Sequence, residues 1–139
     1  MAKFVLELEP DLDFDVIGIC SNHRDYRLCW ALNSGIGLNL VKSDEDFMIS
    51  GKKGAVSGTF SLYEFIDPET RTQFYLIKNK NKNETLLPEL PQLDYVLVLR
   101  ENFDIDPEDF IEKVKKVPSV QTAFLYHAEE LKSASNLIF

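Results

Sequence analysis

The chain has 139 residues, 45% of them hydrophobic, and a formal net charge of -8 at pH 7. This length suits a single domain that buries about two thirds of its unfolded surface without disulfides or a metal. A net negative surface repels phosphate groups, so the charge argues against nucleic acid or anionic lipid as the main partner.

The two cysteines, Cys20 and Cys29, indicate free thiols in a reduced protein. The opening residues lack the basic and then apolar pattern of a secretion signal, and no apolar run approaches the length of a membrane span. We therefore expect a cytoplasmic protein that is not bound to a membrane.

The first predicted strand, residues 3–8, alternates apolar and polar side chains and ends at Pro10. Acidic residues at every second position would line one edge of an extended chain: Glu7, Glu9, Asp11, Asp13 and Asp15. Such a row could gather a hard cation, but it lacks the glycine and terminal glutamate of a calcium loop. We interpret it as a solvated acidic turn and expect no metal or other cofactor.

A second strand is predicted over residues 14–20, followed by a helix over about residues 23–33 that is capped by Ser21 or Asn22. One stripe of this helix is apolar and is expected to face the core: Leu28, Cys29, Leu32 and Ile36. Gly35 and Gly37 are expected to stop the helix before a third strand at residues 38–42.

Tyr26 and Trp30 stand one turn apart on the same helix, away from the apolar stripe. They form an aromatic ridge with two possible roles. The ridge packs under a later hairpin, or it offers a surface to a partner.

Residues 43–58 are rich in small and charged side chains and are predicted to form a loop. Their glycine–lysine sequence lacks the spacing of a phosphate-binding loop, and no helix follows it. Residues 59–66 and 72–80 are predicted to pair as a hairpin, because Asp67 and Pro68 favour a turn between two alternating runs.

Lys78, Lys80 and Lys82 share one side of the second hairpin strand if that strand persists. A positive stripe of this kind could hold a phosphate or carboxylate ligand. The favoured interpretation is that these charges keep an edge strand from pairing with another molecule.

The stretch from residue 87 to residue 100, LPELPQLDYVLVLR, is predicted to hold the central strand. Two prolines three residues apart exclude a helix and are expected to keep the segment extended. Tyr95 to Leu99 then runs without a polar break, as in a strand covered on both faces.

A second helix is predicted after this strand, with Asp106 as its cap, Pro107 in its first turn and Pro118 beyond its end. Residues 120–126 read as the last strand. The apolar end, residues 136–139, is expected to dock onto the domain.

Residues 14–41 and 93–126 share the plan strand, capped helix, strand. The sequence therefore predicts a single α+β domain, with a mainly antiparallel sheet, two principal helices and two ferredoxin-like split βαβ units that flank an inserted hairpin. Sensor domains of the ACT type resemble this plan, and by that analogy a ligand would lie near residues 21–23 or 102–106.

Residues 87–95, LPELPQLDY, resemble the signature of the bacterial IPExxxVDY family. Leucine stands where the family name has isoleucine and valine, whereas Pro88, Glu89, Asp94 and Tyr95 match. DYRL at residues 25–28 also resembles a helix of that family. The resemblance implies a small bacterial cytoplasmic protein and transfers no catalytic role.

The residue types of the signature favour a structural role, in which proline sets the chain direction and carboxylates close turns or pair with arginine. Glu89 and Asp94 would act as catalysts only if they converged on one pocket with shifted pKa values.

The soft metal ligands of the chain are Cys20, His23, Cys29 and His127, and their spacing matches no usual zinc site. Cys20 with His23 could form a nucleophile pair at a strand-to-helix junction, where a helix N-terminus would lower the thiol pKa. No third, orienting group is evident.

Three functions remain open at this level. The first is a non-enzymatic binding or protein-interaction module that uses Tyr26, Trp30 and the hairpin to associate with itself or another protein. The second is an ACT-like sensor that binds a small anion near Lys78, Lys80 and Lys82. The third is an enzyme that works through Cys20 and His23 or through Glu89 and Asp94.

Overall fold

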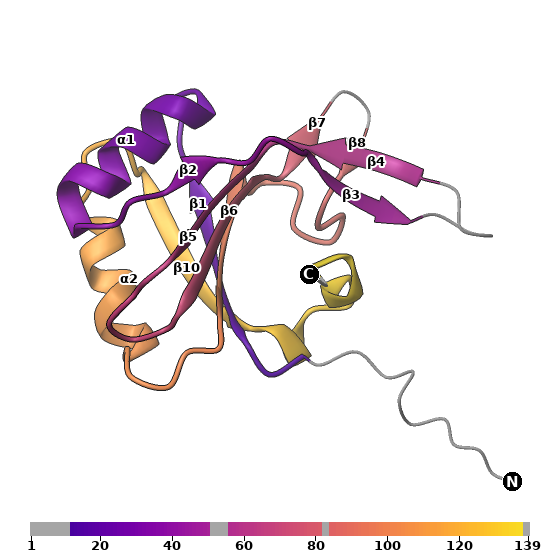
Figure 1. Cartoon of the computed structure of the whole chain (residues 1–139). Helices are drawn as coiled ribbons and strands as arrows, with labels where there is room; N and C mark the ends of the chain where they lie inside the picture. The colour runs from indigo at the N-terminus through magenta and orange to yellow at the C-terminus, as the bar shows by residue number, and fades with distance from the viewer. Residues whose placement is uncertain (1–11, 51–55, 82–83, 138–139) are drawn as a thin grey trace, which may run out of the picture.

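The structure is a computed structural model that describes residues 12–50, 56–81 and 84–137 (Figure 1). Its helices are α1 (Asp25–Ile36) and α2 (Pro107–Lys115), with two short 3-10 helices, η3 (Ala128–Glu130) and η4 (Ala134–Leu137). Its strands are β1 (Asp15–Cys20), β2 (Val41–Lys42), β3 (Phe47–Ser50), β4 (Val56–Phe60), β5 (Leu62–Ile66), β6 (Gln73–Lys78), β7 (Lys80–Asn81), β8 (Glu84–Thr85), β9 (Tyr95–Arg100) and β10 (Thr122–His127).

The main sheet has six strands in the order β10-β1-β9-β6-β5-β2, and every neighbouring pair is antiparallel. β9 lies inside the sheet, between β1 and β6. From Tyr95 to Leu99 each residue is at most 3% exposed. The prediction of a central strand that is covered on both faces is therefore confirmed, as is the α+β class with two principal helices.

Four strands and both helices have the order and directions of a ferredoxin-like unit. β1 and β6 run parallel with β9 between them, and α1 follows β1. β9 and β10 run parallel with β1 between them, and α2 connects them. The split βαβ plan expected from the sequence is present, but the strand that completes the first unit is different from the one predicted.

The strand predicted at residues 38–42 is only the two-residue β2, at the far edge of the sheet. The preceding residue, Leu40, is buried, and its backbone N–H and C=O both bond to the Asn33 side chain of α1, at 2.8 and 3.1 Å. This segment therefore follows the helix instead of entering the sheet. β6 takes the inner position, so the confirmed hairpin of β5 and β6 contributes a strand to the unit and is not merely inserted.

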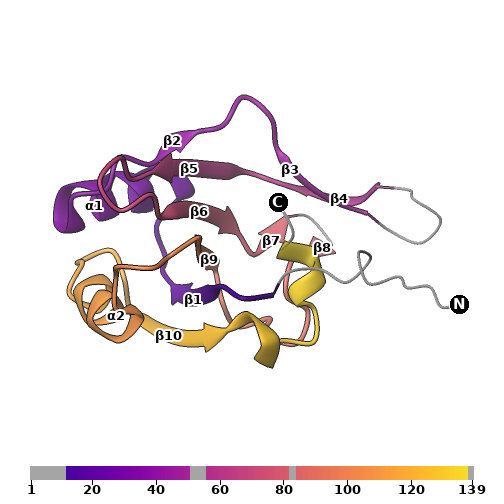
Figure 2. The ribbon, with the colours of Figure 1, turned by 60° about the horizontal axis from the view of Figure 1, so that its bottom comes forward.

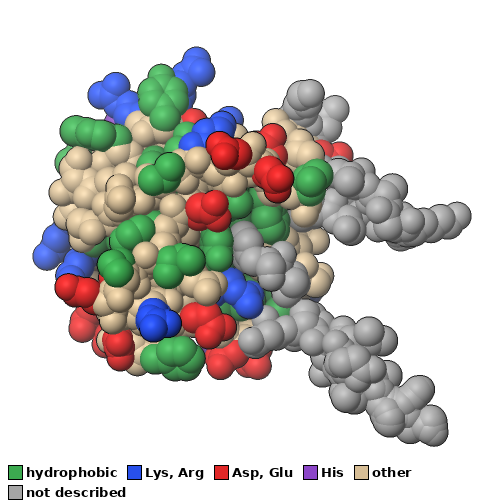
Figure 3. All heavy atoms as spheres, viewed as in Figure 1, with side chains coloured by type: hydrophobic (Ala, Val, Ile, Leu, Met, Phe, Trp, Pro, Cys, Tyr) green, Lys and Arg blue, Asp and Glu red, His purple; other side chains and the backbone are tan. Residues whose placement is uncertain are grey.

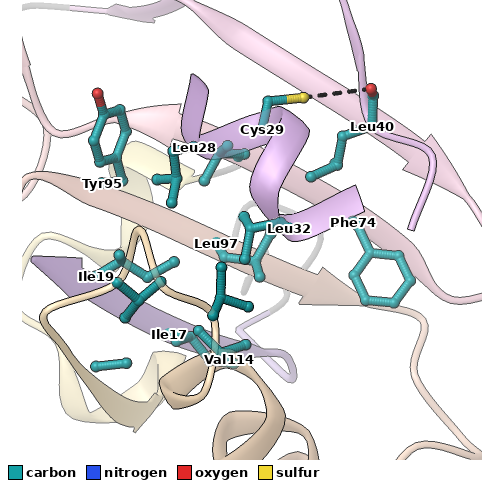
Figure 4. Close-up of a cluster of buried hydrophobic side chains, with 14 of the residues drawn as sticks. Ile17, Ile19, Leu28, Cys29, Leu32, Leu40, Phe74, Tyr95, Leu97 and Val114 are labelled. Atoms are coloured by element: carbon teal, nitrogen blue, oxygen red, sulfur yellow. Dashed lines mark hydrogen bonds between the residues drawn. The ribbon is translucent and has the colours of Figure 1, made fainter. Parts of the chain in front are cut away.

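The sheet separates two apolar cores. On one face, alternate residues such as Ile17, Ile19 and Leu97 pack against α1 and α2, as Figure 4 shows in close-up. On the other face, Val16 and Val98 belong to a second core. This face is covered by β3, β4, residues 86–93 and the two 3-10 helices, which lie on the side of the sheet away from α1 and α2 (Figures 1 and 2).

α1 begins later than predicted. Its N-cap is Arg24, whose guanidinium group has no acceptor and makes no side-chain cap bond, so the prediction of Ser21 or Asn22 as the cap is wrong. Ser21 Oγ instead accepts from the His23 N–H at 3.1 Å, before the helix begins. Gly37 ends the helix in the left-handed conformation at φ 84°, whereas Gly35 lies inside it. The predicted cap of α2 is confirmed, since the Asp106 side chain accepts from the Glu108 N–H at 3.0 Å.

The loop predicted at residues 43–58 contains strands, because β3 and β4 pair as an antiparallel hairpin. Phe47 and Phe60 stand opposite each other in that hairpin, and both are buried in the second core. Several predictions lie outside the described residues: the strand at 3–8, the acidic residues Glu7, Glu9 and Asp11, the GKKG sequence, Lys82 and the last two residues of the chain.

Candidate functional site: the exposed face of the first helix

The outer face of α1 carries two large aromatic side chains in solvent. Tyr26 is 63% exposed and Trp30 is 70% exposed, while the opposite face of the helix buries Leu28 and Leu32. We call Tyr26, Arg27 and Trp30 the aromatic surface. Of the two roles left open by the sequence, the exposure excludes packing under a hairpin and leaves a surface that faces solvent.

A groove of about 380 Å³ adjoins Trp30, between α1 and the loop that follows α2. Its lining is mainly uncharged, contains one arginine and contains no carboxylate: His23, Arg27, Trp30, Ala31, Ser34, Gly35, Pro118 and Ser119. A hydrogen bond of 2.8 Å joins His23 Nδ1 to Ser119 Oγ and ties the two sides of the groove together. Figure 3 shows hydrophobic and basic side chains projecting together over α1.

The signature segment is not extended, contrary to the prediction. Hydrogen bonds from the Leu90 N–H to the Leu87 C=O at 2.9 Å, and from the Leu93 N–H to the Leu90 C=O at 3.2 Å, close two consecutive turns. We call residues 87–93 the double turn. Pro88 and Pro91 each occupy the second position of a turn, which suits the fixed φ of proline. The prolines do exclude a helix, but they reverse the chain instead of extending it.

The side chain of Asn79, a residue that the sequence analysis did not single out, forms hydrogen bonds to the double turn. Its side chain is fully buried and donates to the C=O groups of Leu90 and Leu93, at 3.0 and 2.9 Å. Its Oδ1 accepts from the Leu87 N–H at 2.9 Å. A single amide between two lysines gives no periodic signal, so only the fold identifies this residue.

Glu89 connects the double turn to the C-terminal segment. Its carboxylate accepts from the Ser133 hydroxyl at 2.6 Å and from the Ser133 N–H at 3.0 Å. Partial burial acts to raise the pKa of Glu89, but these bonds outweigh it and lower the pKa below its ordinary value. The contact therefore stabilises the fold above the ordinary pKa of glutamate, and this contribution is lost as the pH falls through the lowered value.

Asp94 and Tyr95 hold the backbone that leads into α1. Asp94 Oδ2 accepts from the Ser21 N–H at 2.9 Å, and the Tyr95 hydroxyl donates to the His23 C=O at 2.6 Å. Burial, followed by the charges of Asp25 and Asp94, raises the pKa of Tyr95 to about 12, so the hydroxyl remains a donor. The end of the signature thus fixes the segment that carries His23 into the groove.

Glu89 and Asp94 are not brought together on a common partner. The first bonds to Ser133 near the chain end and the second to Ser21 before α1. Both carboxylates accept from backbone N–H groups, as a structural role requires, but their partners are serines of distant segments and not the local turns or arginines that were predicted.

The lysine stripe is interrupted. β6 ends at Lys78, Asn79 is buried, and Lys80 belongs to β7, in a separate two-stranded sheet with β8. Lys78 and Lys80 are both exposed, but they do not form one continuous row on a strand as predicted, because the chain leaves the main sheet at Asn79.

Cys20 and His23 do not form a pair with each other. His23 bonds to Ser119, and the Cys20 thiol lies 3.6 Å from the Gln92 C=O. Burial and the nearby Asp94 carboxylate raise the pKa of Cys20, although the charge of Lys80 acts to lower it. The predicted lowering of this pKa by the helix N-terminus is therefore not found. Cys29 donates to the Leu40 C=O in the core, and burial raises its pKa to about 11.

A second hollow of about 270 Å³ lies at the other end of the sheet and contains His127, which the sequence reading had considered only as a metal ligand. His127 Nδ1 stands 3.3 Å from Asp15 Oδ1, and Nε2 stands 3.8 Å from Asp13 Oδ1. Within residues 12–50, 56–81 and 84–137, no group of three or more histidine, cysteine, aspartate or glutamate side chains is arranged to hold a metal. The same residues include no helix that is long and apolar enough to cross a membrane.

No family model, curated protein or solved structure matches the chain. The candidate site is therefore argued from the residues and contacts of this chain, in which two exposed rings stand next to each other beside a groove.

Proposed function

We propose that this protein is a non-enzymatic interaction module whose aromatic surface binds an acidic segment of another protein. The observation that carries the proposal is the pair of exposed rings, Tyr26 and Trp30, beside a groove fixed by internal hydrogen bonds.

Exposed tyrosine and tryptophan are the residue types that contribute most at protein interfaces, because each ring buries a large area and loses little conformational entropy. Here both rings project from a helix whose other face is packed in the core, so they are presented without a rearrangement of the backbone. A partner can cover Trp30 and insert an apolar side chain into the adjoining groove.

The charge of the site supports an acidic partner. The chain as a whole carries -8, yet the groove is lined by Arg27 and by no carboxylate, and Arg24 is exposed on the adjacent turn. A carboxylate in the partner can form a bidentate contact with a guanidinium group. This local charge opposes the charge of the whole molecule and so selects the partner.

The resemblance to the IPExxxVDY family is compatible with a non-enzymatic module, because it implies no catalytic role. Asp94 and Tyr95 bond to the backbone of Ser21 and His23 just before α1, so these two matched residues would serve to present the surface. Two free thiols suit a reducing compartment, and they support the proposal of a cytoplasmic location.

The other two functions have less support. Lys78 and Lys80 lie in different sheets, which weakens an anion sensor built on that stripe. An enzyme would need Cys20 or the signature carboxylates to be activated, and the Cys20 pKa is shifted in the opposite direction.

Trp30 is the sole tryptophan of the chain, so its fluorescence reports directly on the proposed site. We expect peptides selected from a displayed random library to combine Asp or Glu with apolar residues and to shift the Trp30 emission to shorter wavelength. Replacing Tyr26 or Arg27 by alanine should weaken binding by about tenfold, as truncation of an interface anchor typically does.

Phe103→Ala is the matched control for the aromatic change, because Phe103 is 83% exposed and lies outside the aromatic surface. Lys113→Ala controls for the loss of a charge. The proposal is wrong if the selected peptides show no acidic bias, or if they bind Tyr26→Ala and Phe103→Ala equally well.

A further inference from the structure

β10 forms a border of the main sheet, and only β1 pairs with it among the described residues. Figure 2 shows it at the margin of the molecule beside α2. Its six residues, TAFLYH, include no lysine, proline or glycine. Natural proteins usually protect such an edge with charge, proline or a short strand. The opposite border follows that rule, because β2 has only two residues.

The outward backbone groups of β10 can be assigned from its pairing with β1. The Ala128 N–H donates to the Phe14 C=O at 2.9 Å, and this pair continues the register of β1 and β10 by one residue. Backbone groups alternate in direction along a strand, so those of Tyr126, Phe124 and Thr122 face β1. Those of Ala123, Leu125 and His127 point away from the sheet. The His127 N–H already donates to Glu130 Oε1 at 2.8 Å, so the groups of Ala123 and Leu125 are the ones that a further strand would use.

An open, partly apolar groove of about 480 Å³ lies beside this edge, between β10 and α2. Its lining combines four residues of each element: Glu108, Ile111, Glu112, Lys115, Ala123, Phe124, Leu125 and Tyr126. Phe124 is 43% exposed, and its side chain lies on the other face of β10, because it alternates with Ala123 and Leu125, which pack on the side of α2. A strand added here would gain backbone hydrogen bonds and cover apolar side chains at the same time.

We propose that the strand added to this edge is β10 of a second copy, so that two chains form one continuous antiparallel sheet about a two-fold axis near Phe124 and Leu125. The charges of α2 identify the occupant. Glu108 and Asp109 lie in its first turn, and Lys113 and Lys115 lie in its last turn, where Lys115 Nζ also stands 3.5 Å from Glu112 Oε2. A two-fold axis reverses the second helix, so Glu108 of each copy lies toward Lys115 of the other, and the surface is complementary to itself.

Phe124→Lys tests the edge. Two lysines near the axis repel each other and replace an aromatic contact, so we expect the dimer association constant to fall about tenfold or more. Phe103→Lys makes the same exchange at an exposed phenylalanine in the loop before α2 and should leave the dimer intact. Analytical ultracentrifugation measures the dimer association constant of both variants, and thermal unfolding checks that each variant is folded.

Charge reversal tests the two-fold geometry. Glu108→Lys and Lys115→Glu should each weaken the dimer, and the double variant should restore it, because opposite charges then face each other again. This rescue distinguishes antiparallel self-pairing from any other use of the edge.

Three results overturn the inference. The first is a chain that stays monomeric at about 100 μM. The second is a dimer that Phe124→Lys leaves unchanged. The third is a monomeric chain that becomes dimeric when residues 1–11 are removed. The last result would assign the edge to the strand that the sequence predicts at residues 3–8. None of these results bears on the aromatic surface of α1, which is tested separately.

Discussion

Asn79 shows how one buried polar residue determines a local fold. Its side-chain Nδ2 donates to two C=O groups of the double turn, and its Oδ1 accepts from one N–H of the turn. Its backbone C=O accepts from the Leu86 N–H at 2.7 Å. A buried amide with all of these partners is stable, but each partner loses its bond if the amide is removed. The double turn is therefore held by three bonds to the Asn79 side chain as well as by its own two turn bonds.

We therefore expect Asn79→Ala to lower the free energy of unfolding by about 3 kcal/mol, measured by urea denaturation. Asn39→Ala is the control, because Asn39 is exposed and alanine there should have little effect. A change below about 0.5 kcal/mol for Asn79→Ala would show that water replaces the amide and that the hydrogen-bond account is wrong.

At the scale of elements, Gly18 of β1 lets the double turn pack directly on the sheet. A Cβ atom at Gly18 would stand 2.5 Å from Leu93 Cδ1, closer than any real contact, and Leu93 is fully buried. The glycine is present because Leu93, the last residue of the double turn, occupies the space that a side chain would need.

Gly18→Ala should cost about 1–3 kcal/mol of stability through overpacking. The cost should shrink when Leu93 is also replaced by alanine, because the clashing atoms are then absent, and a double-mutant cycle measures the difference. Gly35→Ala is the control within α1, where the added methyl meets Val117 Cγ2 at 3.2 Å and alanine favours the helix. Equal costs of Gly18→Ala in both backgrounds would contradict this account.

For the whole molecule, the C-terminal segment completes the second core. Leu137 is fully buried, and Asn136 Nδ2 donates to the Leu86 C=O at 2.8 Å, so η4 is attached to the segment that leads into the double turn. The core on this face of the sheet combines β1, β9, the double turn and the chain end, which are far apart in sequence.

Leu137→Ala should lower the free energy of unfolding by about 2–4 kcal/mol, because it leaves a cavity between η4 and the sheet. Ile66→Ala is the control, since Ile66 is 58% exposed at the end of β5 and should cost less than about 1 kcal/mol. Equal losses for the two variants in denaturant unfolding would mean that the chain end does not belong to the cooperative core.

Several features of the candidate site could be predicted from the sequence because they depend on neighbouring residues. The spacing of Tyr26 and Trp30 places both rings on one side of a helix, and the apolar stripe of α1 determines that this side faces away from the core. The groove could not be predicted, because its other side comes from Pro118 and Ser119, more than eighty residues later.

The sequence by itself determined the elements with strong local signals. The unbroken apolar run predicted the central strand β9. Asp106 and Pro107 predicted the start of α2, and Asp67 with Pro68 predicted the turn of the β5–β6 hairpin. These signals are local because helix caps, turns and alternation involve residues that are adjacent or one turn apart.

Only the tertiary structure decided which strand completed the first βαβ unit, that the two prolines formed turns, and that Cys20 and His23 took separate partners. The physical reason is that each outcome depends on contacts between distant segments, such as Asn33 with Leu40 or Asn79 with the double turn, whose energies exceed local preferences.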